Sequence, residues 1–218
     1  MKKQLIIFDL DGTLVDTVID LKEAVNFSLE KHQEPTKSLE HVTKSIGNGV
    51  ETLIARCLND GFSNPKYNEV LSDFRKYYLS HYDVFTSPYE GVLSSLKLLE
   101  EKGFKLAVCT NKLHEAACEI IDKYFPNIFD YVLGSKKELN KKPHPDMLNN
   151  VMTNFSYIPK DLVVYIGDTD VDVDSGKNAN IDYILVSYGY RNKKELLDYD
   201  SKAQIISSFS DLINILEI

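Results

Sequence analysis

Two hydrophobic patterns divide the chain of 218 residues. From about residue 84 onwards, short and continuously apolar runs alternate with segments whose apolar residues recur every three or four positions. The runs predict buried strands, and the periodic segments predict helices. The expected strands are 105–109, 129–133, 162–166 and 184–186, and the expected helices are 89–102, 114–124, 147–155 and 211–216. Because these strands are apolar throughout, we expect a parallel sheet that helices cover on both faces.

The segment from 15 to 83 differs, because its apolar residues keep helical spacing and no strand-like run occurs in it. Thr17 and Asp20 each stand three residues before an acidic residue, which is the spacing of a helix capping box. One more buried run, Leu5–Phe8, precedes this segment. The simplest organisation is an α/β core with a doubly wound parallel sheet, formed by residues 1–14 and 84–218. A helical cap, residues 15–83, is then inserted after the first strand.

Composition and charge narrow the class of protein. Hydrophobic residues make up 43% and charged residues 27%, as in an ordinary globular domain, and the net charge is −8. An acidic chain without runs of Lys or Arg is not expected to bind nucleic acid, and no apolar run approaches the length of a membrane span. The three cysteines form neither a metal-binding pair nor a disulfide framework. We therefore expect a reduced, cytoplasmic protein, either a monomer or a homodimer.

Acidic side chains follow two of the expected strands. Asp9 and Asp11 come directly after the first strand, and Asp168 and Asp172 follow the strand at 162–166. The carboxyl ends of parallel strands meet near the point where the strand order reverses, so we expect these side chains to lie close together. Neighbouring carboxylates repel each other unless a cation lies between them. Without His or Cys nearby, such an oxygen-only site suits Mg²⁺.

Groups that can hold a phosphate follow two other strands. Thr110 and Asn111 come after the strand at 105–109, and Lys142 lies in the loop after the strand at 129–133. Each of these features has an ordinary explanation on its own: a turn, a helix cap or a solvated lysine. Their common position after strands favours a site for a phosphorylated ligand.

The order of these groups resembles the haloacid dehalogenase superfamily of phosphatases. Its four motifs are matched in order by DLDGT (9–13), VCTN (108–111), KKPHPD (141–146) and GDTDVDVDSGKNAN (167–180). The resemblance covers nearly the whole chain, including the inserted cap. Within the superfamily the sequence looks most like phosphoglycolate phosphatases. The resemblance implies a Mg²⁺-dependent hydrolase of a small phosphorylated metabolite, with 2-phosphoglycolate as the first candidate.

The resemblance also implies a role for each matching acid. Asp9 attacks phosphorus and becomes an aspartyl phosphate. Asp11 protonates the leaving alkoxide and later activates the water that cleaves the phosphoenzyme. Mg²⁺ is held by the Asp9 carboxylate, the Asp11 backbone carbonyl and Asp168, and Asp172 supports the site. Asp170 and Asp174 receive no role.

The remaining candidate residues hold the phosphate or shape the site. Phosphoryl oxygens are expected to contact Thr110, the Asn111 backbone and Lys142. Gly12 is expected to let the chain turn sharply beside the phosphate. In the cap, the turn at Gly47 and Asn48 leads into a helix N-terminus, and we hypothesise that it contacts the leaving group. A plain turn between helices explains the same residues equally well.

Several other functions share parts of this pattern. A pyrophosphatase or a sugar phosphomutase of the same superfamily has the same core motifs and differs mainly in the cap. A non-catalytic phosphate-sensing module, such as a phospho-aspartate receiver, does not need an acid two residues after the nucleophile, so Asp11 argues against it. A dehalogenase does not need Mg²⁺, so the pairing of Asp11 with Asp168 argues against that activity.

Overall fold

The computed structural model describes residues 3–216. Its centre is a six-stranded sheet of order β5-β4-β1-β6-β7-β8, in which every neighbouring pair is parallel. The strands are β1 (Leu5–Phe8), β4 (Lys105–Leu113), β5 (Tyr131–Ser135), β6 (Val163–Gly167), β7 (Asp182–Val186) and β8 (Gln204–Ile206). The chain builds the sheet outward from β1 in both directions, which confirms the predicted doubly wound parallel α/β sheet. The carboxyl ends of β1, β4 and β6 are therefore neighbours.

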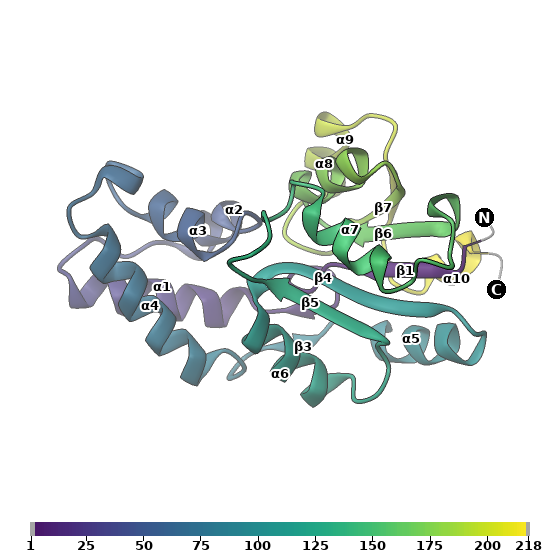
Figure 1. Cartoon of the computed structure of the whole chain (residues 1–218). Helices are drawn as coiled ribbons and strands as arrows, with labels where there is room; N and C mark the ends of the chain where they lie inside the picture. Colours follow the sequence, from purple (N-terminus) through teal and green to yellow (C-terminus); the bar gives the residue numbers. More distant parts are fainter. Residues whose placement is uncertain (1–2, 217–218) are drawn as a thin grey trace.

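Helices cover both faces of this sheet (Figure 1). One face packs against α5 (Val92–Glu101), α6 (His114–Tyr124) and α10 (Asp211–Ile215). The other face packs against α7 (Asp146–Thr153), α8 (Asp170–Ala179) and α9 (Lys193–Tyr199).

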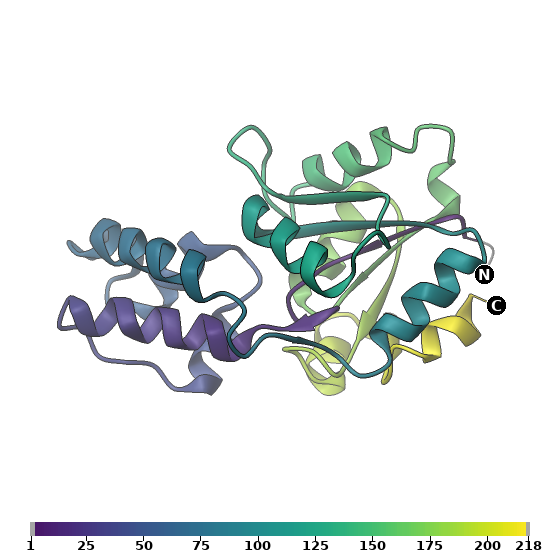
Figure 2. The same cartoon turned by 90° about the horizontal axis from the view of Figure 1, so that it is seen from below.

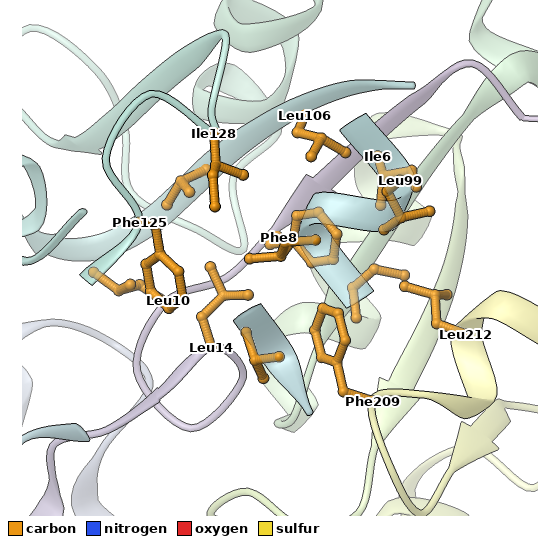
Figure 3. Close-up of a cluster of buried hydrophobic side chains, with 14 of the residues drawn as sticks. Ile6, Phe8, Leu10, Leu14, Leu99, Leu106, Phe125, Ile128, Phe209 and Leu212 are labelled. Atoms are coloured by element: carbon orange, nitrogen blue, oxygen red, sulfur yellow. The ribbon is translucent and has the colours of Figure 1, made fainter. Parts of the chain in front are cut away.

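The side chains of β1 are buried on both faces of the sheet, which explains why its sequence is apolar without interruption. Ile6 and Phe8 point into the cluster of the first face, whereas Leu5 and Ile7 point into the cluster of the second. Phe8 lies at the middle of the first cluster and stacks on Phe209 at 5.7 Å between ring centroids (Figure 3). All four β1 side chains are fully buried. Each such burial contributes about 1.5–3 kcal/mol, which holds the strand that carries the site rigidly in place.

A second lobe of helices is inserted between β1 and β4, which confirms the predicted helical cap. It contains α1 (Val18–Lys31), α2 (Leu39–Ser45), α3 (Val50–Cys57) and α4 (Tyr67–His81), with a short 3₁₀ turn, η1 (Gly61–Ser63). The lobe has its own hydrophobic cluster, and it stands apart from the sheet, on the side away from both chain ends (Figure 2). A two-stranded antiparallel ribbon, β2 (Val15–Asp16) with β3 (Ser87–Pro88), joins the two lobes.

Some local predictions for the segment 15–83 were wrong. β2 is a strand, but its two residues are too few to show a pattern. The capping boxes do not form, because both side chains have tertiary partners instead. The Thr17 hydroxyl donates to Asp11 Oδ1 at 2.8 Å. Asp20 lies inside α1 and accepts from the backbone N–H and the hydroxyl of Thr86 at 2.8 and 2.7 Å.

Within the core, neither α9 nor β8 was predicted. The signal for α9 was present, since Asn192 and Glu195 form a true capping box at its start. β8 is three residues long and lies at the edge of the sheet. Across residues 3–216, no helix combines the length and the apolar character needed to cross a membrane.

Candidate active site

The carboxyl ends of β1, β4 and β6 bring most of the predicted residues to one edge of the sheet, under the cap. A pocket opens there between the lobes. Its core side is lined by polar groups, namely Asp9, Asp11, Thr110, Asn111 and Lys112. Its cap side is lined mainly by apolar groups, namely Leu21, Ile46, Val50, Leu53 and Tyr78. The pocket is therefore polar on the core side and apolar on the cap side.

Three buried carboxylates form a cluster beside this pocket. Asp9, Asp168 and Asp172 each offer an oxygen, and these oxygens lie within 4.8 Å of one another. Lys142 is the ammonium within the cluster: its Nζ lies 3.1 Å from Asp9 Oδ1 and 3.0 Å from Asp172 Oδ1. Asp168 instead accepts hydrogen bonds from neutral donors, the Thr13 hydroxyl at 3.1 Å and the Tyr190 N–H at 2.8 Å. The cluster thus holds three carboxylates and one ammonium, which contacts two of them.

The pKa values reflect this imbalance. Burial, opposed by Lys142 and reinforced by Asp172 and Asp11, raises the pKa of Asp9 to about 6. Burial together with Asp172 and Asp9 raises the pKa of Asp168 well above its ordinary value. Burial also acts to raise the pKa of Asp172, but Lys142 and hydrogen bonds from Tyr165 and Thr169 lower it below its ordinary value.

The cluster fits a divalent cation. Its ligand atoms are carboxylate oxygens alone, it is buried, and its negative charge exceeds what Lys142 neutralises. A hard cation such as Mg²⁺ prefers oxygen ligands and would remove the repulsion that raises the pKa values of Asp9 and Asp168. The side chain of Asp11 is not part of the cluster.

Gly12 lets the turn after β1 pack against Asp168, which follows β6. Its φ of +85° lies in the left-handed region, and a Cβ there would stand 2.2 Å from Asp168 Oδ2. Gly189 is equally confined, because a Cβ on it would stand 2.2 Å from the Gly12 carbonyl oxygen. Any side chain at Gly12 would therefore displace the carboxylate of Asp168.

Asp11 points away from the acidic cluster and toward the cap. Its Oδ1 accepts from Lys112 Nζ and from the Thr17 hydroxyl, each at 2.8 Å. Lys112 also donates to the hydroxyl of Tyr78, which comes from α4 of the cap. Although burial alone would lower the pKa of Lys112, Asp11 and Tyr78 raise it above the ordinary value, so the ammonium stays charged. The sequence places Lys112 directly after Asn111, behind an expected strand, but sequence reasoning gave this lysine no role.

Asn111 ties three segments together. Its side-chain amide donates to the carbonyl oxygens of Lys142 and Gly47, both at 2.9 Å, and its Oδ1 accepts from the Lys142 N–H at 3.0 Å. The Lys142 loop is thereby fixed to β4, and the cap turn is fixed to both. Thr110 lines the pocket, and its Oγ1 accepts from the backbone N–H of Lys112 at 3.2 Å. Within residues 3–216 no acceptor binds its hydroxyl proton, which can therefore be donated into the pocket.

The two cap residues predicted to contact the leaving group, Gly47 and Asn48, differ in position. Gly47 lines the pocket, whereas Asn48 is absent from the lining and its side chain accepts from Arg56 at 2.9 Å. Sequence reasoning also missed Tyr190, whose ring packs in the hydrophobic cluster of the cap. Its hydroxyl lies 2.7 Å from the Thr17 hydroxyl. Since the Tyr190 backbone holds Asp168, this residue links the acidic cluster to the cap.

Comparison with known proteins agrees with this geometry. The sequence model described as haloacid dehalogenase-like hydrolase matches residues 6–186. A phosphoglycolate phosphatase from Aquifex aeolicus is 34% identical over 216 residues, which cover 98% of this chain and 97% of the relative. A phosphoglycolate phosphatase from Cereibacter sphaeroides is 32% identical and covers 86% of each chain.

A solved structure also has the same arrangement of both lobes. A predicted phosphoglycolate phosphatase from Haemophilus somnus superposes with a TM-score of 0.90 at 26% identity, over 99% of this chain and 98% of that one. The match to the family covers both lobes and every residue of the site except those that follow β7. The chain belongs to the haloacid dehalogenase-like hydrolase family.

Proposed function

We propose that this enzyme is a Mg²⁺-dependent phosphatase that hydrolyses a small phosphate monoester through an aspartyl phosphate on Asp9, with 2-phosphoglycolate as the substrate. The supporting observation is the position of the Asp9 carboxylate. Its Oδ1 is held by the Leu10 N–H at 2.8 Å and by Lys142, while no donor within residues 3–216 binds its Oδ2. One oxygen is thus anchored and the other is free to bond to phosphorus.

The two steps divide between Asp9 and Asp11. Asp9 attacks phosphorus as the bond to the ester oxygen breaks, and Asp11 gives that oxygen its proton so that the alcohol leaves neutral. Asp11 then takes a proton from the water that attacks the phosphoenzyme, which releases phosphate and restores Asp9. The placement of Asp11 on the cap side of Asp9 suits this work, because the leaving group lies on that side. Thr110, the Asn111 backbone and Lys142 would bind phosphoryl oxygens.

Mg²⁺ would be held by the carboxylates of Asp9 and Asp168 and by the backbone carbonyl of Asp11, with Asp172 in support. When bound, the cation neutralises charge on the phosphoryl oxygens. Asp172 also orients Lys142, because one carboxylate accepts from Lys142 and from the backbone N–H groups of Asp168 and Thr169.

The apolar wall of the cap favours a small leaving group. Leu21, Val50 and Leu53 offer no hydrogen bonds to the hydroxyl groups of a sugar, and buried hydroxyls without partners are costly. A hexose phosphate, the substrate expected of a phosphomutase, therefore fits poorly. We propose that residues 15–83 close as a cap over the leaving group and exclude water. In this cap the backbone of Gly47, rather than the Asn48 side chain, is our candidate for substrate contact.

A panel of phosphate esters tests the proposal. The purified chain is assayed for phosphate release from 2-phosphoglycolate, pyrophosphate, a hexose 1-phosphate and p-nitrophenyl phosphate, with Mg²⁺ and with EDTA. Asp9→Asn is the control for contaminating phosphatases. We expect Mg²⁺-dependent release that is fastest from 2-phosphoglycolate and is lost in Asp9→Asn.

Other outcomes would separate the alternatives. Faster release from pyrophosphate, or conversion of the hexose 1-phosphate into an isomer, would replace the substrate but keep Asp9 as nucleophile. Full activity in EDTA or in Asp9→Asn would overturn the mechanism. A protein that binds phosphate esters without releasing phosphate would be a sensing module.

A further inference from the structure

We propose that Lys112 and Tyr78 form a seat for a carboxylate on the leaving group, so that this enzyme selects phosphate esters of small hydroxy acids. The inference rests on the proposed phosphatase function and deepens it. It assigns the choice of substrate to one cationic side chain of the core and one hydroxyl of the cap.

Lys112 has the position that such a seat needs. It is the one cationic side chain among the residues that line the pocket, and only 5% of it is exposed. An ammonium has three N–H donors. Within residues 3–216 two of these have partners, Asp11 Oδ1 and the Tyr78 hydroxyl. One donor of a buried, charged group is therefore left for a ligand in the pocket.

Tyr78 completes the seat from the opposite lobe. Tyr78 is 1% exposed, and Lys112 Nζ lies 4.8 Å from the centroid of its ring. Burial raises the pKa of Tyr78 to about 12, so the hydroxyl keeps its proton. Because this hydroxyl accepts from Lys112, its own proton can be donated to a carboxylate oxygen. The seat exists only when cap and core are in contact, so it recognises the leaving group in the closed enzyme.

The distance between the seat and the reaction centre fits a short acid. Lys112 Nζ lies 2.8 Å from Oδ1 of Asp11, the residue that delivers the proton to the ester oxygen in the proposed mechanism. In an ester of a 2-hydroxy acid, the carboxylate is carried by the carbon next to the ester oxygen. A group bound at the ester oxygen by Asp11 therefore has its carboxylate within reach of the neighbouring ammonium. The apolar wall of Leu21, Val50 and Leu53 leaves no second polar seat for a longer chain.

Other cations near the cap are less suitable. Lys141 and Arg75 both bind Glu51 on α3, and neither lines the pocket. Lys142 lies on the phosphate side and is bound to Asp9 and Asp172. Lys112 is thus the cation on the leaving-group side.

The test compares two substrates that differ only in charge. In phosphoglycolamide a neutral amide replaces the carboxylate of 2-phosphoglycolate. A hydrogen bond between two charged groups is stronger than one to a neutral amide. We therefore expect the unaltered enzyme to prefer 2-phosphoglycolate by roughly 10- to 150-fold in kcat/KM. Lys112→Met should reduce this preference to within about threefold, mainly by raising KM for 2-phosphoglycolate. Tyr78→Phe, which keeps the ammonium, should reduce the preference by a smaller factor.

Lys137→Met is the matched control, because it removes one positive charge at an exposed position outside the pocket. It should keep the preference of the unaltered enzyme. If Lys112→Met slows both substrates by the same factor, Lys112 acts only through Asp11 and the proposal is wrong. Equal rates on both substrates in the unaltered enzyme would also refute it, without any variant having to fold. If the unaltered enzyme releases phosphate from neither ester, the proposed function fails first, and the seat has no substrate to select.

Discussion

Asp168→Asn should make the metal-free enzyme more stable while it removes the response to Mg²⁺. Asp168 is fully buried and lies near Asp9 and Asp172, but Lys142 contacts only the other two carboxylates. Asn has nearly the same shape and can still accept from the Tyr190 N–H. The substitution thus removes one uncompensated buried charge with little change in packing.

The sign of the effect and its pH dependence follow from the pKa shifts. A folded-state pKa above the ordinary value means that the folded state binds protons more tightly, so stability falls as pH rises through the interval between the two values. For Asp9 the rise from 3.8 to about 6 corresponds to about 3 kcal/mol. The pKa of Asp168 is shifted in the same direction, by burial and by the carboxylates of Asp172 and Asp9. Leaving a buried polar group without compensation costs about 1 to 3 kcal/mol and more for a charge, so we expect Asp168→Asn to add about 2 to 3 kcal/mol at pH 8 and almost nothing near pH 4.

Thermal unfolding measures both parts of this prediction. In EDTA at pH 8 the variant should melt roughly 4 to 12 °C above the unaltered enzyme. With Mg²⁺ at about 100 times its Kd, the unaltered enzyme should gain about 2.7 kcal/mol, and the variant much less. Asp174→Asn is the control: Asp174 lies on α8, outside the cluster, and an Asn there can still accept from the Tyr199 hydroxyl.

Two results would refute this reasoning. One is a variant that melts below the unaltered enzyme in EDTA at pH 8, since the buried charge would then not be destabilising. The other is an equal gain from Mg²⁺ in both proteins, because the cation would then bind elsewhere.

Three further predictions concern the other parts of the site. Gly12→Ala should lower kcat/KM by about 100-fold or more, because the Cβ of the alanine would displace Asp168. A kcat/KM within about tenfold of the unaltered enzyme, measured by steady-state kinetics, would contradict this. Asp11→Asn should slow the first step by about 10²- to 10⁴-fold for an alkyl ester but much less for p-nitrophenyl phosphate, since nitrophenolate leaves without a proton. An equal reduction of the burst rate for both esters would count against Asp11 as a general acid. Arg191→Ala removes the donor to the carbonyl oxygens of Thr43, Lys44 and Ile46 at the end of α2. It should raise KM about tenfold and change the melting temperature little; an unchanged KM would show that this contact does not hold the cap closed.

The sequence predicted the sheet and the acidic cluster for a simple reason. Buried parallel strands must be apolar throughout, and their carboxyl ends must meet, so Asp9, Thr110 and Asp168 could be placed together from the sequence alone. The resemblance to a family then supplied roles that spacing alone could not distinguish from turns and caps.

The contacts between cap and core could not be predicted in the same way. Lys112 and Tyr78 are 34 residues apart and lie in different lobes, and their contact depends on how the cap packs over the sheet. Thr17 shows the same limit, since its local spacing indicates a helix cap while its hydroxyl binds Asp11. Local sequence patterns predict hydrogen bonds to nearby residues, whereas Lys112, Tyr78 and Thr17 form theirs with residues that only the packed fold brings close.

The central claim is that the free oxygen of Asp9 forms a bond to phosphorus. Rapid acid quenching of the enzyme with labelled substrate and Mg²⁺, followed by peptide mapping, measures this directly. The account predicts a hydroxylamine-sensitive phosphoryl group on the peptide that contains Asp9, absent in Asp9→Asn and absent in EDTA. Two results would contradict the account. One is steady turnover with the label on a residue other than Asp9. The other is the absence of a labelled peptide in Asp11→Asn, because this variant should accumulate the phosphoenzyme.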